Sequence, residues 1–124
     1  MCLATKQKWP KIAWKPITTY KVVYSPYDYP SLLTLFQSFP IQIGCAYKVS
    51  LIKILKTRIK VSGIHLMRKG IHSYKKESPA RFMARLNMNK NTIVVKCTIP
   101  RFSLYWIGDN DDIVSNKLKY VKIL

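Results

Sequence analysis

The chain has 124 residues, of which 22 are Lys or Arg and only 5 are Asp or Glu, so its formal net charge at pH 7 is +17. Apolar residues make up 48% of the chain, a fraction typical of globular proteins, and this excludes a disordered basic tail. The length is typical of one folded domain. Because like charges at this density repel one another, we expect this domain to bind nucleic acid or an acidic protein surface.

The first segment of the chain is basic and aromatic. Residues 1–16 combine four lysines with Trp9 and Trp14 and contain no acid. Two prolines disfavour a helix at the residues before them, so we expect an extended arm, followed by a single α+β domain over residues 17–124. The arm lacks the apolar stretch that a signal peptide needs, so we expect no secretion through one.

The next elements are predicted to be short and extended. Ile17–Tyr24 alternates in the manner of a β-strand. Residues 31–36 and 51–55 fit either a helical turn or a short strand, and their periodicity leaves both alternatives open. Residues 41–49 are predicted as one extended segment, with a bulge where Gly44 interrupts it.

An uncharged run in this region has almost the length of a membrane span. It covers Tyr29–Tyr47, but it contains Pro30 and Pro40 together with several polar side chains. Those residues break the run into two shorter pieces. We therefore predict two core segments and no association with a membrane.

One helix is predicted, over about residues 78–87. Ser78 is a suitable N-cap, and Pro79 would occupy the first helical position, where its missing N–H is not needed. The apolar stripe that would pack on the sheet consists of Phe82, Met83 and Leu86.

The remaining segments indicate further strands. Residues 56–62 alternate basic and apolar side chains, and residues 92–99 form a β-branched run. Strands are also predicted over 103–107 and 116–123, with a polar turn at 108–112. Together these elements predict the fold class α+β, a small and mostly antiparallel β-sheet domain with one short helix packed on it.

Basic side chains provide the candidate binding residues. On a strand, Lys56, Arg58 and Lys60 would project from one face about 7 Å apart, close to the spacing of phosphates along a nucleic-acid strand. The alternative is a solvated edge strand whose lysines prevent aggregation. The candidate contacts with a polyanion or an acidic coat protein are Lys6, Lys8, Trp9, Lys11, Trp14, Lys15, Lys56, Arg58, Lys60, Arg68, Lys69, Lys75 and Lys76.

Aromatic residues are interleaved with these charges. Rings in such positions can stack on unpaired bases, as they do in single-strand-binding proteins. The alternative is that they build the core, because Tyr and Trp contribute large buried areas. We favour the core for most of them.

The chain has few residues suited to catalysis or metal binding. Glu77 is its single glutamate, and Asp28 is its one aspartate outside the 108–112 turn. Cys97 lies in an apolar strand, which would raise the thiol pKa, and the widely spaced cysteines favour a reducing compartment. His65 and His72 have no further ligands nearby in the sequence. We therefore predict no catalytic residue, no metal site and no cofactor.

Several segments resemble known proteins. The motifs are Met1-Cys2-Leu3-Ala4-Thr5-Lys6, Tyr20-Lys21-Val22-Val23, Gly70-Ile71-His72-Ser73-Tyr74 and Val94-Val95-Lys96-Cys97-Thr98-Ile99-Pro100. With them the chain resembles a family of short, functionally uncharacterised proteins from Bacteroides-group bacteria and their phages, including crAss-like phages. The resemblance implies a phage-related origin and transfers no catalytic residue. Those proteins tend to follow Ile-Pro with a basic residue and Gly-Ser, whereas this chain has Arg101-Phe102-Ser103, so a different turn is expected there.

The same histidine-containing stretch is similar to part of the ADP-ribosyltransferase-like folds. Those folds need a catalytic glutamate late in the chain, and the last acid here is Asp112. A transferase therefore ranks below two binding functions. The leading hypothesis is a non-enzymatic virion component, capsid-associated or auxiliary, that docks on acidic coat protein or packaged nucleic acid and can join a larger assembly. The alternative is a nucleic-acid-binding regulator or host-defence antagonist in the host cytoplasm.

Overall fold

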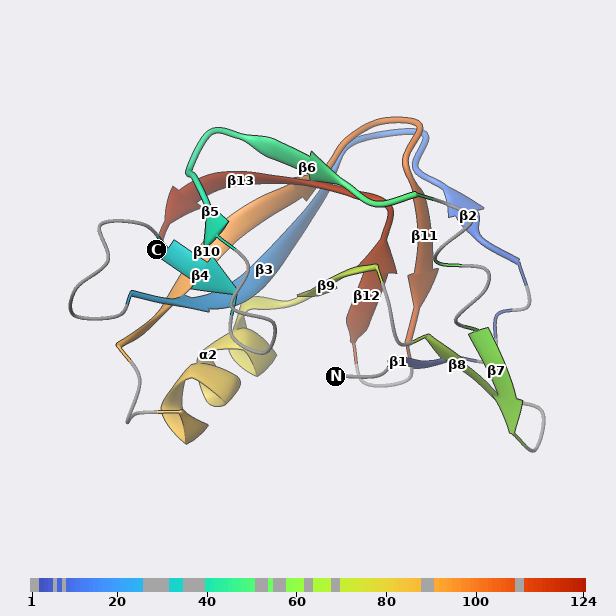
Figure 1. The fold of residues 1–124 in the computed structure, drawn as a ribbon, viewed down its shortest axis with the longest axis horizontal. Coiled ribbons are helices and arrows are strands. Elements are labelled where there is room, and N and C mark those ends of the chain that lie inside the picture. The colour runs from blue at the N-terminus through green and yellow to red at the C-terminus, as the bar shows by residue number, and fades with distance from the viewer. Residues whose placement is uncertain are drawn as a thin grey trace.

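The computed structural model describes residues 3–5, 7, 9–25, 32–34, 40–50, 54, 58–61, 64–67, 70–87, 91–108 and 111–124. These residues form one antiparallel sheet of ten strands with a short helix packed on it, beside a small sheet of three strands (Figure 1). The predicted α+β class is confirmed. In the part of the chain that is described, no helix has the length and apolar character needed to cross a membrane.

The large sheet is built around a central row of eight strands. In spatial order they are β2 (Lys11–Ile12), β11 (Leu104–Ile107), β12 (Asp112–Ser115), β9 (Ile71–Tyr74), β3 (Ile17–Tyr24), β10 (Thr92–Ile99), β13 (Lys117–Ile123) and β6 (Ala46–Lys48). Two more strands extend from β3, namely β4 (Leu32–Thr34) and β5 (Pro40–Ile41). The small sheet has the order β1 (Leu3–Thr5), β8 (Ile64–Met67) and β7 (Arg58–Val61).

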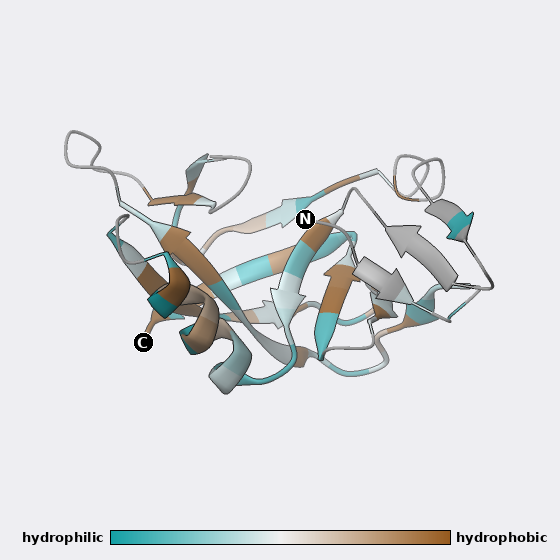
Figure 2. Ribbon diagram, turned by 90° about the horizontal axis from the view of Figure 1, so that it is seen from below, coloured by the Kyte–Doolittle hydropathy of each residue, from teal (hydrophilic) through white to brown (hydrophobic). Residues whose placement is uncertain are grey.

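The longest ladder pairs β3 with β10 along all eight residues of each strand. Their alternation gives the sheet two apolar faces, and Figure 2 shows hydrophobic and hydrophilic stretches side by side on these strands. One face carries the main core, whose fully buried members include Val23, Val95, Cys97, Leu118 and Tyr120. The opposite face of β3 and β10 is covered by the helix.

Helix α2 (Glu77–Leu86) confirms the predicted helix but differs in detail. Its N-cap is Lys76, which makes no side-chain capping bond, so the Ser78 cap is wrong. Pro79 is the third helical residue, where its missing N–H is still one of the unpaired groups of the first turn. The predicted stripe is wrong for Phe82 and Leu86, which are 60% and 63% exposed, whereas Met83 does pack against the sheet.

Small residues make the helix contact with the sheet. Ala80 is fully buried against Val22 and Val94, with Met83 and Ala84 beside them. Alanine at 80 and 84 lets the helix lie close to the strands, and this geometry turns residues 82 and 86 toward solvent.

Other expectations are corrected or completed by the strands. Residues 41–49 are not one extended segment, because a turn at Gly44, with φ +89°, separates β5 from β6. In the ambiguous segment 31–36, residues 32–34 are a strand; of 51–55, Ile54 alone lies inside the described residues. Strand β7 confirms part of the predicted strand 56–62. Strands β9 and β12 were not predicted.

Candidate polyanion-binding surfaces

The candidate residues from the sequence come from separate elements. Lys11, Trp14 and Lys15 are exposed on or just after β2, Lys60 is exposed on β7, and Lys75 precedes α2. Lys76, also next to α2, forms an ion pair of 3.5 Å with Asp111. Those that lie outside the described residues are Lys6, Lys8, Lys56, Arg68 and Lys69, and the Arg58 side chain is likewise not described.

An aromatic cluster with adjacent cations lies at the β2–β11 edge. Trp14 and Phe102 pack edge to face, with ring centroids 6.2 Å apart and an interplanar angle of 89°. The Arg101 guanidinium carbon lies 4.6 Å from the centre of the Phe102 ring. We define the aromatic–basic patch as Lys11, Trp14, Lys15, Arg101 and Phe102.

Backbone hydrogen bonds hold the two segments that carry these rings side by side. The Phe102 N–H donates to the Ala13 carbonyl at 2.6 Å, and the Ala13 N–H donates to the Ser103 carbonyl at 2.9 Å. Both Ala13 and Ser103 are buried. Trp14 therefore directly follows one buried residue, and Phe102 directly precedes the other. The backbone beneath both rings is thus held in place before any partner binds.

The side chain of Gln7 ties the preceding arm to the same strand. Its amide nitrogen donates to the carbonyls of Trp9 and Tyr105, and its amide oxygen accepts from the Ile107 N–H at 3.2 Å. Trp9 is 64% exposed. Trp9 and Trp14, both named as candidate contacts, are thus exposed, whereas Trp106 is fully buried in the core.

The Phe102 backbone has an unusual conformation for its residue type. Its φ is +70°, in the left-handed region that favours glycine. A residue with a Cβ pays about 1–2 kcal/mol in this region. The phenyl ring is nevertheless 60% exposed, so little burial offsets this strain.

A second basic surface lies on β10, β13 and β6. Lys117 lies directly opposite Lys48, and Lys96 lies directly opposite Lys122. Lys119 projects from the same face as Lys117, two residues away. This face is the reverse of the one that buries Leu118 and Tyr120. The lysine face is defined by Lys48, Lys96, Lys117, Lys119 and Lys122.

Like charges directly opposite each other destabilise a sheet. Two such pairs occur on the lysine face, and none of the acids that the structure describes, Glu77, Asp111 and Asp112, lies on its three strands. Glu77 and Asp111 are instead paired with Arg81 and Lys76. The lysine face therefore concentrates positive charge without a described protein carboxylate beside it.

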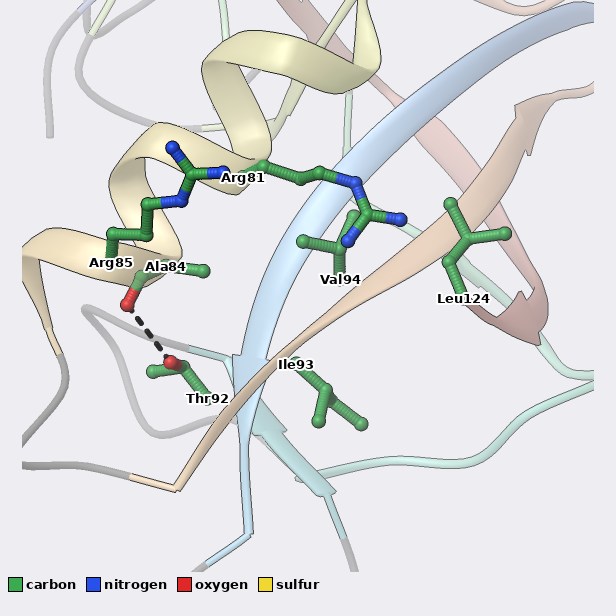
Figure 3. Close-up of a pocket in the computed structure, with 7 residues that line it drawn as sticks. All are labelled: Arg81, Ala84, Arg85, Thr92, Ile93, Val94 and Leu124. Carbon is green, nitrogen blue, oxygen red and sulfur yellow. Dashed lines mark hydrogen bonds between the residues drawn. The ribbon is translucent and has the colours of Figure 1, made fainter.

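A pocket borders this surface at the end of α2 (Figure 3). Its volume is about 390 Å³, and it is lined by Arg81, Ala84, Arg85, Thr92, Ile93, Val94 and Leu124. Arg81 also binds Glu77 at 2.7 Å, whereas Arg85 is exposed at the rim. The side chains of the lining include two guanidinium groups and no carboxylate, imidazole or thiol, so these side chains extend the positive surface and offer no acid–base pair.

One lysine points into the protein. The Lys21 ammonium donates to the His72 carbonyl, at a place where β3 passes from pairing with β9 to pairing with β4. Burial lowers the pKa of Lys21 to about 8, although the nearby Cys97 opposes this effect. Burial raises the pKa of Cys97 to about 12, as the apolar strand predicted, and it raises the pKa of Tyr120 as well.

These interior groups do not form an activated nucleophile. A thiol with a raised pKa carries almost no thiolate at neutral pH. Among the described residues, no three His, Cys, Asp or Glu side chains come together as they would around a metal ion. Cys45 and Cys97 are both free thiols.

Comparison with known proteins gave no relative: no protein-family model, no curated protein and no solved structure matches the chain. The positively charged surfaces therefore have to be interpreted from their own chemistry.

The lysine face was missed at the level of sequence. The sequence places Lys117 and Lys119 on the opposite face of a strand from Leu118 and Tyr120. The opposition of these lysines to Lys48 depends on strand pairing, which the alternation does not specify. Phe102 was missed as well, because a residue after Pro100 gives no sign of its left-handed backbone.

Proposed function

We propose that this protein is a non-enzymatic, phage-associated binding protein that docks on a polyanion, either packaged nucleic acid or acidic coat protein in a virion. The lysine face is the observation that carries the proposal. Its opposed lysine pairs cost stability in the isolated protein, and a polyanion would remove that cost by placing negative charge between them.

The distribution of acids supports the same function. Two of the three described acids already pair with basic residues, Glu77 with Arg81 and Asp111 with Lys76. The chain has 22 basic residues against 5 acids, so most of its positive charge must be balanced by counterions or by a partner. Release of those counterions is what drives binding to a phosphate backbone.

The experiment compares two variants that lose equal charge. Lys117→Gln/Lys119→Gln removes two charges from the lysine face, and Lys60→Gln/Lys75→Gln removes two from elsewhere. Binding to a labelled single-stranded oligonucleotide is measured by fluorescence anisotropy at several salt concentrations. If each lysine on the face neutralises a phosphate, the negative slope of log K against log salt becomes less steep by about 1.4 in the first variant. A salt slope in Lys117→Gln/Lys119→Gln equal to that of the wild type would contradict a role for the lysine face.

The aromatic–basic patch favours a second candidate, a nucleic-acid-binding regulator or host-defence antagonist in the cytoplasm. Exposed rings among cations suit nucleic acid better than an acidic protein surface. Mass spectrometry of purified particles separates the two settings, because a virion component is recovered with the particles in fixed stoichiometry. A regulator is absent from them and is recovered with nucleic acid from infected cells.

A further inference from the structure

Trp14 and Phe102 form an exposed pair of rings on two segments that backbone hydrogen bonds join. Trp14 is 67% exposed and Phe102 60% exposed, although the two rings touch. Single exposed apolar residues are common on protein surfaces. Here two large rings are presented together, and the backbone hydrogen bonds of Phe102 and Ala13 hold the segments that carry them side by side.

The conformation of Phe102 indicates that stability alone does not explain this residue. Glycine would adopt φ +70° without steric cost, whereas phenylalanine is strained there. Strained residues that persist on a surface are candidates for a functional role. The gain from contact with Trp14 and Arg101 is of the same order as the strain, so the exposed ring surface is left without a structural purpose.

The charges around the rings determine which partner fits. Lys11, Lys15 and Arg101 are all exposed, and the chain contains no acid before Asp28. A partner must therefore supply negative charge together with flat apolar faces. Single-stranded nucleic acid supplies both, because its phosphates pair with cations and its unpaired bases stack on aromatic rings. A duplex keeps its bases stacked inside, and the carboxylate side chains of an acidic protein surface carry no ring.

We propose that Trp14 and Phe102 form a stacking platform for unpaired nucleobases, which makes single-stranded nucleic acid the preferred polyanion. This inference rests on the proposed function and specifies its partner. Strand β2 and helix α2 lie toward opposite ends of the molecule (Figure 1). Phe82, which is also 60% exposed but lies on α2, therefore provides a matched aromatic residue outside the platform.

The test measures anisotropy with three labelled ligands of equal length: a single-stranded oligothymidine, an abasic strand with the same phosphates, and a duplex. Wild-type protein is expected to bind oligothymidine most tightly. Trp14→Ala should weaken oligothymidine binding about 5- to 100-fold and leave abasic binding unchanged. Because no charge is removed, the salt slope should stay the same. Phe82→Ala should bind all three ligands like the wild type.

Phe102→Gly guards against a loss caused by misfolding. Glycine suits the backbone at this position, so the variant keeps its fold while it loses the ring. It should reproduce the selective loss of oligothymidine binding, with an unchanged circular dichroism spectrum.

Two results would overturn the platform. Equal losses on oligothymidine and on the abasic strand would show that the rings do not contact bases. Unchanged oligothymidine binding in Trp14→Ala and Phe102→Gly would also show that the rings do not contact bases. In either case, steep salt-dependent binding of the wild type would leave the proposed function intact. Failure of the wild type to bind any of the three ligands would instead refute docking on nucleic acid, and with it the platform.

Discussion

Replacing Lys21 by methionine should change how stability depends on pH. The pKa of Lys21 is about 8 in the fold, against an ordinary 10.5. The unfolded chain therefore holds a proton that the folded chain has lost between these two values, and stability rises with pH across that interval. Because one pKa unit corresponds to about 1.4 kcal/mol, the buried ammonium costs the fold about 3 kcal/mol at pH 7 relative to pH 10.5.

Cys97 acts in the opposite direction. Its pKa is about 12 in the fold against 9.0 for the ordinary thiol, so its contribution is complete below pH 9 and is lost as pH rises toward 12. The wild type should thus gain roughly half a kcal/mol between pH 8 and pH 9. Its stability should then stay nearly level to about pH 10 and fall above that.

Lys21→Met should remove the rise in unfolding free energy that Lys21 causes between pH 8 and pH 10.5, and it should keep the fall that Cys97 causes above pH 9. Urea unfolding at constant ionic strength, at pH 7, 8, 9 and 10, should show the free-energy difference between variant and wild type shifting by about 3 kcal/mol in favour of the wild type as pH rises. Lys96→Met, which removes a lysine from the outer face of the neighbouring strand, is the matched control. Parallel pH profiles for Lys21→Met and the wild type would refute the burial of the ammonium.

Three further substitutions test the packing. Gly70→Ala should lower the free energy of unfolding in urea by about 1–3 kcal/mol more than Gly44→Ala does. Both glycines have positive φ, but of the two only Gly70 has no room for a Cβ, which would overlap Val114. Equal losses in the two variants would contradict this close packing. Phe102→Gly should leave the unfolding free energy within about 1 kcal/mol of wild type, since relief of strain offsets the lost ring contacts, and a large loss would mean that the ring is structural. Glu77→Gln should lower the free energy of unfolding, measured by heating, by less than about 1 kcal/mol, because its ion pair with Arg81 is exposed. A larger loss would mean that Glu77 stabilises the start of α2 more strongly than an exposed ion pair can.

The central strands could be predicted from the sequence because their pattern is long and regular. Strands β3 and β10 are eight residues each and rich in β-branched residues, and their pairing builds the core. Strands β9 and β12 are four residues each and contain His72, Ser73 and Asp112. Such short, partly polar segments have no periodicity of their own, and only pairing with neighbours makes them strands.

The functional surfaces could be predicted only in part, because they depend on tertiary arrangement. Excess charge and the tryptophans of the arm were evident from composition, and Trp14 does lie in the aromatic–basic patch. The lysine face requires the register of β13 against β10 and β6, including the irregularity between Lys96 and Cys97. Short-range pattern does not determine a register of that kind.

The most direct test of polyanion docking is the salt dependence of binding by the unmodified protein. A labelled single-stranded oligonucleotide of about 16 nucleotides is titrated at salt concentrations from about 50 to about 200 mM. If the five lysines of the lysine face each neutralise a phosphate, log K falls linearly with log salt with a slope of about −3.5 or steeper. Binding that is absent at the lowest salt, or that does not change with salt, would contradict docking on a phosphate backbone.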